Sequence, residues 1–261
     1  MTGSDVQLVQ SLSRGLAVIR AFDGERPRQS LAQVAEATGL PRATVRRFLH
    51  TLVAEGYAAS NGSVFWLTPR TLELGYSYLS SLGLPAIAQP HLDALSRTLN
   101  ESCSLTVLDK SDVVYVARAA ANRIMSVNIT IGTRFPAYAT SMGRVLLAGL
   151  PPAALDAYLA GTALRPFTPK TVTNPDALKQ LLIDVRRQGH CIADQELELG
   201  LRSVVCPVRG SAGTAVAAVN VSAHAGAVGH REVVDRLLPP LQATALAIER
   251  DLHATLMKES L

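Results

Sequence analysis

The stretch GLPRATVRRFLHTLVAEGYA, residues 39–58, decides how the N-terminal part of the chain folds. Its apolar residues recur with the period of an α-helix and fall on one side of it. These residues are Val45, Phe48, Leu49 and Leu52. The opposite side holds Ala43, Arg46, Arg47 and His50, with Arg42 and Thr44 beside them near the N-terminal end. Such a charged face either is simply solvated or contacts a partner.

Signals on both sides of this helix predict a winged helix-turn-helix. Ser30 and Gln33 have the spacing of a capping box and Gly39 suits the position past a helix end, which predicts a helix over 30–38. Pro41 suits the first position of the next helix. The segment YAASNGSVFWLT, residues 57–68, predicts a strand, an Asn-Gly turn and a second strand. An earlier helix, ending near residue 22, is predicted by the spacing of Leu8, Leu12, Leu16 and Ile19.

The positive charge of the chain is concentrated in this N-terminal part. The formal net charge is +4 over 261 residues. Residues 1–70 carry eight arginines against five acidic residues, an excess of three, whereas residues 71–261 carry 17 basic against 16 acidic residues. A local excess of positive charge favours an anionic polymer as the partner of the N-terminal part.

The charged face of the helix over residues 41–54 is therefore predicted to bind double-stranded DNA. No acidic residue lies between residues 37 and 54, so the arginines lack the i,i+4 partners that solvated helix faces often carry. Arginine can donate two parallel hydrogen bonds to guanine, and other arginines can pair with phosphates. The candidate DNA contacts, including the tip of the hairpin, are Ser30, Arg42, Thr44, Arg46, Arg47, His50, Asn61 and Ser63.

The rest of the chain alternates predicted strands and helices, which indicates an α+β domain around an antiparallel sheet. Strands are predicted over residues 103–108, 113–118, 125–131, 191–194, 204–208 and 215–222, and helices over 146–150, 153–159, 176–188 and 230–253. A linker helix is predicted over 69–84. The predicted domains are thus residues 1–68 for DNA binding and 85–261 for the α+β domain.

Several other classes of protein are disfavoured. No run of 18 apolar residues occurs and the N-terminus lacks a signal-peptide pattern, so we expect a cytoplasmic protein without a membrane partner. Cys103, Cys191 and Cys206 are odd in number and show no C-x-x-C spacing, which predicts reduced, mostly buried thiols. His190 and Cys191 would point to opposite faces of a strand, so no metal site is predicted.

An enzyme is also disfavoured. The segment TSMGR, residues 140–144, contains a serine but lacks the Gly-x-Ser-x-Gly elbow of serine hydrolases. No glycine-rich phosphate loop or metal signature occurs elsewhere in the sequence. We therefore expect no catalytic residues and no cofactor.

The stretch GTRFPAYATSMGRVLLAG, residues 132–149, predicts a loop that enters an apolar helix. Either Thr140 or Ser141 can cap this helix, and the free N–H groups of Ser141, Met142 and Gly143 would then face an anion. The alternative is an ordinary helix start that binds nothing.

The chain as a whole resembles the IclR family of bacterial transcription regulators. The resemblance rests on SLSRGLAVIRAF, SLAQVAEATGLPRATVRRFLHTLVAEGYA and FWLTPRTLELG in the N-terminal part, and on GTRFPAYATSMGRVLLA and DQELELGLRSVVCPV in the C-terminal part. RRFLHTL, VVYVAR and QELELGLRS look most similar to the branch that regulates protocatechuate, 4-hydroxybenzoate and β-ketoadipate catabolism. The resemblance implies a winged helix-turn-helix, a linker helix and a GAF/PAS-like effector-binding domain.

The resemblance also implies an assembly and a ligand site. It implies homodimers formed through the DNA-binding domains, often paired into homotetramers, and hence a palindromic operator. A small aromatic or aliphatic carboxylate would accept backbone N–H bonds from Ser141 and Met142, next to Gly143. Other implied pocket residues are Asp194, Leu201, Ser203, Asn220 and Ser222, with Val127 and Phe135 as apolar walls. Arg134 and Arg202 would either neutralise a dicarboxylate or pair with Glu196 or Glu198.

Together these observations predict a ligand-responsive, DNA-binding regulator of aromatic-acid catabolism in the β-ketoadipate pathway. One alternative is a regulator of the same family that serves a different carboxylate pathway. The other, which the sequence supports least, is an enzyme with a fused DNA-binding domain.

Overall fold

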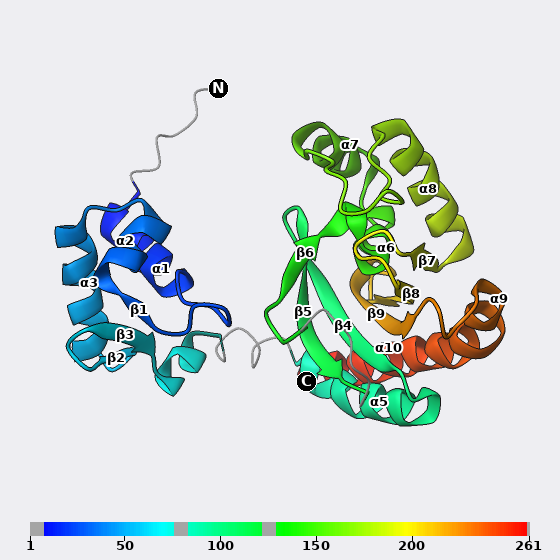
Figure 1. The fold of residues 1–261 in the computed structure, drawn as a ribbon. Coiled ribbons are helices and arrows are strands. Elements are labelled where there is room, and N and C mark those ends of the chain that lie inside the picture. Colours follow the sequence, from blue (N-terminus) through cyan, green and yellow to red (C-terminus); the bar gives the residue numbers. More distant parts are fainter. Residues whose placement is uncertain (1–7, 76–82, 122–128, 260–261) are drawn as a thin grey trace, which may run out of the picture. The chain divides into compact units, whose positions relative to one another are not determined.

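The computed structural model describes residues 8–75, 83–121 and 129–259. The chain forms two compact units, Met1–Ser81 and Leu82–Leu261, which are drawn in Figure 1. The linker helix predicted over 69–84 begins with a 3-10 turn at Pro69–Thr71. Most of its second half, residues 76–82, lies outside the described residues, so the linker helix and the domain borders at 68 and 84 stay predictions.

The N-terminal unit is a winged helix-turn-helix, as the sequence predicts. Its sheet has the antiparallel order β1-β3-β2. Its elements are α1 (Gln10–Arg20), β1 (Gln29–Ser30), α2 (Leu31–Thr38), α3 (Arg42–Ala54), β2 (Ala58–Ser60) and β3 (Val64–Leu67). The short strand β1 was not predicted.

Local signals set the borders of these helices. The predicted capping box is present, since the Ser30 hydroxyl accepts from the Gln33 N–H while the Gln33 side chain accepts from the Ser30 N–H. Gly39 follows α2 with a left-handed φ of 66°, which a glycine adopts without steric cost. Pro41 is the N-cap of α3, so the helix begins at Arg42, one residue later than predicted. The predicted apolar side of α3 packs inward, because Val45 and Leu49 are fully buried.

The C-terminal unit is an α+β domain around one six-stranded antiparallel sheet with the order β6-β5-β4-β9-β8-β7. Its strands are β4 (Ser102–Asp109), β5 (Asp112–Ala119), β6 (Arg134–Pro136), β7 (Cys191–Asp194), β8 (Leu201–Arg209) and β9 (Ala215–His224). Its helices are α5 (Leu84–Leu99), α6 (Ser141–Ala148), α7 (Pro152–Gly161), α8 (Pro175–Gln188), α9 (His230–Glu232) and α10 (Leu238–Glu259).

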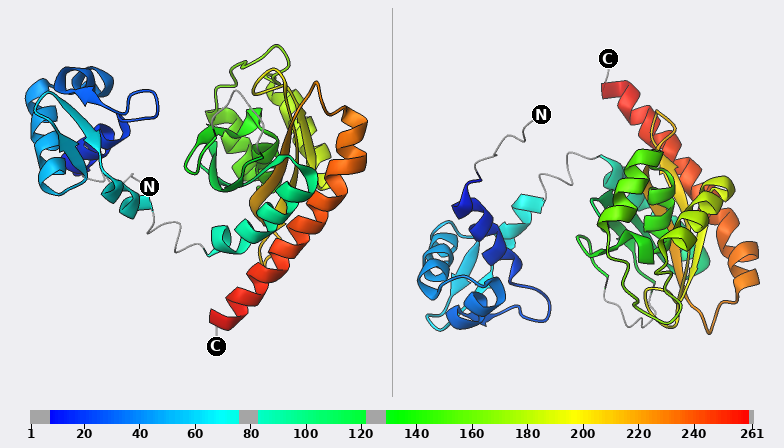
Figure 2. Two further views of the ribbon diagram at one scale, coloured as in Figure 1. Left: turned by 60° about the horizontal axis from the view of Figure 1, so that its bottom comes forward. Right: turned by 90° about the horizontal axis from the view of Figure 1, so that it is seen from above.

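The helices of this unit lie in two layers on either side of the sheet. Helices α5 and α10 pack against each other and against one face, and Figure 2 shows how far α10 runs along it. Helix α6 packs against the other face, with α8 behind it and α7 beside it in Figure 1. The N-terminus of α6 is therefore directed onto the middle strands of the sheet, and this arrangement positions the candidate ligand site.

Two predicted elements differ from the structure. The strand predicted over 125–131 is wrong for residues 129–131, and its first four residues lie outside the described part of the chain. A turn closed by the Thr133 N–H and the Thr130 carbonyl occupies this place, so the chain joins the sheet only at Arg134. The helix predicted over 230–253 is interrupted by a π-helical turn at Val233–Leu237. Pro239 and Pro240 lack an N–H, which prevents an undisturbed i→i−4 pattern there.

The three cysteines are free and buried, as predicted. Burial raises the pKa of Cys103 to about 12, of Cys191 to about 11 and of Cys206 to about 12. The thiols are therefore protonated at neutral pH, which leaves little reactive thiolate. Among the helices that the structure describes, none is both long enough and apolar enough to span a membrane.

Candidate functional site

The outward face of α3 carries unneutralised positive charge. Arg42, Arg46, Arg47 and His50 are exposed, while Thr44 is half-buried. Within the described part of the chain, none of the three arginines forms an ion pair. The helix has 13 residues and is held from behind by its buried apolar side. This is the shape and charge of a helix that enters the major groove of DNA.

The wing and the start of α2 flank this helix. Asn61 shapes the wing tip, because its Oδ1 accepts from the backbone N–H groups of Ser63 at 3.1 Å and Val64 at 3.0 Å. Gly62 has a φ of 93°, which a non-glycine residue rarely adopts. The Ser30 hydroxyl is already engaged in the capping box. Asn61 and Ser30 thus fix the wing tip and the start of α2, and Ser63 is exposed.

The C-terminal unit contains a narrow cavity between the N-terminus of α6 and the sheet. Thr140, not Ser141, caps the helix, because its Oγ1 accepts from the Gly143 N–H at 3.0 Å. The backbone N–H groups of Ser141 and Met142 donate to no atom of the described residues. Both residues are buried, and their amides occupy the positive end of the helix dipole. The cavity therefore presents two unpaired donors in a site that favours an anion.

Polar side chains form the sheet side of this cavity, on a face that is otherwise apolar. The polar residues of β8 and β9 that line the cavity are Ser203, Asn220 and Ser222, each less than 9% exposed. Apolar residues complete the walls, and they include Tyr115, Ile129, Leu197 and Leu201. Apolar walls with a few convergent polar groups are typical of small-molecule sites.

A buried ion pair fixes the loop on one side of the cavity. Arg144 of α6 has no exposed side-chain surface and pairs with both carboxylate oxygens of Glu196, which lines the cavity. Its Nε also donates to the Tyr138 carbonyl at 2.8 Å. Although burial lowers the pKa of Arg144, the hydrogen bonds and charge of Glu196 hold it above its usual value. Helix α6 and the loop after β7 are therefore held together by a charged contact.

Comparison with known families decides the class of the protein. The IclR helix-turn-helix domain matches residues 11–62, and the C-terminal domain of the bacterial transcriptional regulator IclR matches residues 76–250. The chain belongs to the IclR family. It is accordingly a transcriptional regulator and not an enzyme.

Individual relatives of this IclR-family protein are similar to it in sequence or structure over nearly the full chain. The Pca regulon regulatory protein of Pseudomonas putida is 45% identical over 249 residues, covering 95% of this chain and 84% of the relative. A solved structure of a transcriptional regulator from Rhodococcus sp. RHA1 is 57% identical, with a TM-score of 0.86 and coverage of 95% and 100%. An IclR homologue from Microbacterium hydrocarbonoxydans, solved with 4-hydroxybenzoate, is 27% identical, with a TM-score of 0.81 and coverage of 93% and 98%.

Six of the predicted effector contacts of this IclR-family chain converge on the cavity at α6. They are Ser141, Met142, Leu201, Ser203, Asn220 and Ser222. Gly143 lies behind them, packed against the backbone of Ala137. Phe135 packs edge-on against Tyr115, with ring centroids 6.0 Å apart, and is not among the cavity-lining residues that the structure describes. Val127 lies outside the described residues.

The two arginines predicted as alternatives both have carboxylate partners in the protein. Arg134 is 43% exposed and pairs with Asp109 at 2.8 Å and Asp112 at 3.2 Å. Arg202 pairs with Asp194 at 2.8 Å, and hydrogen bonds from Lys170 and Arg202 hold the pKa of that carboxyl below its usual value despite some burial. Both arginines therefore pair with aspartates, whereas the sequence analysis named Glu196 and Glu198 as their possible ion-pair partners.

The sequence analysis missed Arg118, which lies on the same face of the sheet as the cavity. Its Nη1 donates to the Ser104 hydroxyl at 3.1 Å, and no described carboxylate lies within ion-pair distance of it. Burial lowers the pKa of Arg118. A bulge at Val116 shifts the alternation of β5, so that Tyr115 and Arg118 face the same side.

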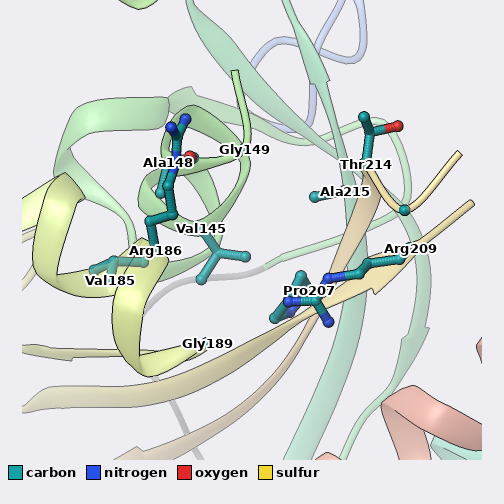
Figure 3. A pocket seen from close by; sticks show the side chains of 11 residues that line it. Val145, Ala148, Gly149, Val185, Arg186, Gly189, Pro207, Arg209, Thr214 and Ala215 are labelled. Atoms are coloured by element: carbon teal, nitrogen blue, oxygen red, sulfur yellow. Dashed lines mark hydrogen bonds between the residues drawn. The ribbon is translucent and has the colours of Figure 1, made fainter. Parts of the chain in front are cut away.

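A second hollow lies at the opposite end of α6 (Figure 3). It is lined by the C-terminal ends of α6 and α8 and by the β8–β9 hairpin. Arg186 is already engaged there by the carbonyls of Ala148 and Leu150, and Arg209 faces Glu249 at 3.7 Å. Because helix C-termini carry partial negative charge, this hollow suits an anion less well than the cavity at the N-terminus of α6.

Proposed function

We propose that the protein regulates aromatic-acid catabolism of the β-ketoadipate pathway by binding operator DNA through α3 and a small carboxylate at the N-terminus of α6. The carrying observation is the buried pair of amides at Ser141 and Met142 that have no acceptor among the described residues, with Arg118, which pairs with no described carboxylate, on the same sheet face. The relatives from Pseudomonas putida and Microbacterium hydrocarbonoxydans support the class of effector, through the regulon named for the first and the 4-hydroxybenzoate bound to the second.

The electrostatics of the cavity favour an anionic ligand over a neutral one. The helix dipole of α6 and the charge of Arg118 both stabilise negative charge, and burial strengthens each effect by excluding water. Arg144, on the same side of the sheet, is neutralised by Glu196, whereas Arg134 and Arg202 lie on the opposite face by strand register and pair with aspartates. Within the described part of the chain, Arg118 is thus a cation without a carboxylate partner on the cavity's face of the sheet, and a carboxylate ligand would supply one.

Replacing Arg118 with glutamine is expected to weaken the binding of 4-hydroxybenzoate or protocatechuate by about tenfold, which corresponds to about 1.4 kcal/mol. Isothermal titration calorimetry on the full chain measures the change. The matched control is Arg134→Gln, because Arg134 is already paired with Asp109 and Asp112 and is expected to leave the affinity within about twofold. Equal losses in both variants would show that only the overall charge matters.

The operator is proposed to be palindromic and bound by a homodimer formed through the N-terminal units. An apolar stripe on and before α1 supports this, because Leu8, Leu12 and Leu16 are 71%, 63% and 46% exposed. Leu12 and Leu16 are four residues apart and lie on one face of α1, and Leu8 directly precedes the helix. A second copy of the same helix would bury this face, and pairing of C-terminal units would extend the dimer to a tetramer.

Replacing Leu12 with aspartate is therefore expected to dissociate the dimer, because two carboxylates would be buried at its centre. Sedimentation velocity should show a smaller species at micromolar concentration, and operator affinity should fall with it. Ile183→Asp is the control, since Ile183 is an apolar residue of comparable exposure, 53%, on the C-terminal unit. A wild-type sedimentation coefficient for Leu12→Asp would contradict the proposed dimer surface.

The proposed sequence-specific contact of α3 with operator DNA is tested with Arg47→Ala. This variant is expected to lose specific operator binding by about 10- to 100-fold while keeping the wild-type affinity for the carboxylate. Footprinting on the DNA upstream of the chain's own coding sequence measures the loss. Arg231→Ala removes the same charge from a residue that is 96% exposed on the C-terminal unit, and should leave the footprint unchanged. An intact footprint for Arg47→Ala would reject the assignment.

The regulatory step is proposed to be a shift between dimer geometries. The carboxylate binds one geometry more tightly than the other, and only this difference in affinity can change the population of either. The chain from α3 to the cavity runs through residues 69–84, so this segment is proposed to transmit the shift. A cytoplasmic location follows from this role.

A further inference from the structure

The polar side chains beneath α6 satisfy one another, with one exception. The Ser141 and Ser203 hydroxyls are 2.8 Å apart, and the Thr106 hydroxyl donates to the Met142 sulfur at 3.3 Å. Asn220 Nδ2 donates to the Ser222 hydroxyl at 2.8 Å. Asn220 Oδ1, in contrast, has no hydrogen-bond partner among the described residues.

The unpartnered Asn220 oxygen belongs to a buried side chain that lines the cavity. Asn220 is only 2% exposed and lies on β9 in the middle of the sheet, where it lines the cavity at the N-terminus of α6. A buried acceptor without a donor costs free energy, so native proteins rarely keep one without a function. The Asn220 amide is held by the hydrogen bond from its Nδ2 to the Ser222 hydroxyl.

We propose that Asn220 Oδ1 accepts a hydrogen bond from a hydroxyl group of the effector and thereby selects hydroxylated carboxylates. This inference rests on the proposed function, in which a carboxylate binds in the same cavity. It assigns the two ends of the ligand different partners. The N–H groups of Ser141 and Met142, which have no acceptor among the described residues, attract the carboxylate, whereas Asn220 Oδ1 repels it and takes a donor.

The selectivity follows from the chemistry of a lone acceptor. An effector hydroxyl supplies the missing donor, whereas an analogue with hydrogen or fluorine at that ring position leaves Oδ1 buried and unpaired. A site built in this way rejects the analogue more strongly than an apolar pocket would. The apolar walls at Ile129, Leu197 and Leu201 hold an aromatic ring equally well with or without the hydroxyl.

The test compares matched probes on the full chain by isothermal titration calorimetry. The probes are 3- and 4-hydroxybenzoate and their counterparts 3- and 4-fluorobenzoate, in which fluorine has a similar size but cannot donate. The wild-type protein is expected to prefer the hydroxyl form at least tenfold in one of the two pairs. In Asn220→Leu this preference should fall below about threefold, through weaker binding of the hydroxybenzoate and not of the fluorobenzoate.

Thr106→Val is the matched control, because Thr106 is a buried polar residue of the same sheet face whose hydroxyl already has a partner and which is not among the described residues that line the cavity. It should keep the wild-type preference. Should Asn220→Leu fail to fold, the comparison of probes on the wild-type protein still decides. Equal binding of both members of each pair, as expected if a water served Oδ1, overturns this inference alone. Binding of none of the four probes overturns the proposed effector class, and this inference with it.

Discussion

Replacing Glu196 with leucine is expected to lower the free energy of unfolding of the C-terminal unit by about 3–5 kcal/mol. The variant leaves the Arg144 guanidinium buried without its carboxylate, although the Tyr138 carbonyl still accepts from its Nε. An uncompensated buried charge is costly because little water can reach it. The loss should be measured by urea denaturation followed by far-UV circular dichroism.

Two comparisons separate the cost of the orphaned charge from the value of the pair itself. The double variant Arg144→Met/Glu196→Leu should recover most of the lost stability, because it removes both charges together. The exposed pair Lys179–Asp156, 2.7 Å apart, serves as control, and Asp156→Leu should cost less than about 1 kcal/mol. A double variant as unstable as Glu196→Leu would mean that packing, and not charge, accounts for the effect.

The same variant should also weaken effector binding. Glu196 and Leu197 line the cavity on the loop after β7, and Arg144 ties this loop to α6. The donors at Ser141 and Met142 belong to the same helix. Stability and affinity are therefore coupled through one side chain, even though Arg144 is not itself among the cavity-lining residues that the structure describes.

The DNA-binding unit could be predicted almost completely from the sequence because its signals are local. The capping box of α2 spans four residues, Gly39 marks the helix end, and the period of α3 separates its buried side from its charged side. Each signal acts within one or two helical turns. Only the two-residue strand β1, which depends on pairing with the distant β3, lacked such a signal.

The effector cavity could be predicted only in part, because its chemistry depends on contacts between distant segments. Simple alternation along β5 places Arg118 on the face opposite Tyr115, and the bulge at Val116 reverses this in the structure. Likewise, no spacing in the sequence indicates that Arg202 on β8 pairs with Asp194 on the adjacent strand β7. Nor does any spacing indicate that Arg144 of α6 pairs with Glu196 in the loop after β7. The family resemblance named the cavity residues, but not which charges are already neutralised.

Replacing Gly143 with alanine is expected to destabilise the C-terminal unit by at least about 3 kcal/mol and to abolish the effector response. A Cβ at this position would overlap the backbone of Ala137, including its carbonyl oxygen and Cα. Ala137 cannot retreat at low cost, because its N–H donates to the Ser111 carbonyl at 2.9 Å. Backbone meets backbone here, so no side-chain rotation relieves the overlap.

The two units of the chain make this loss measurable in isolation. Trp66 is the only tryptophan and lies in β3 of the N-terminal unit, so its fluorescence follows that unit alone. In Gly143→Ala the circular dichroism transition should move to lower urea while the Trp66 transition stays in place. Gly161→Ala is the matched control, because no atom lies within 4 Å of an added Cβ there, and its effect should be below about 1 kcal/mol. Wild-type stability in Gly143→Ala would mean that α6 can shift away from Ala137, and the close approach that aims its N-terminus at the cavity would then not be required.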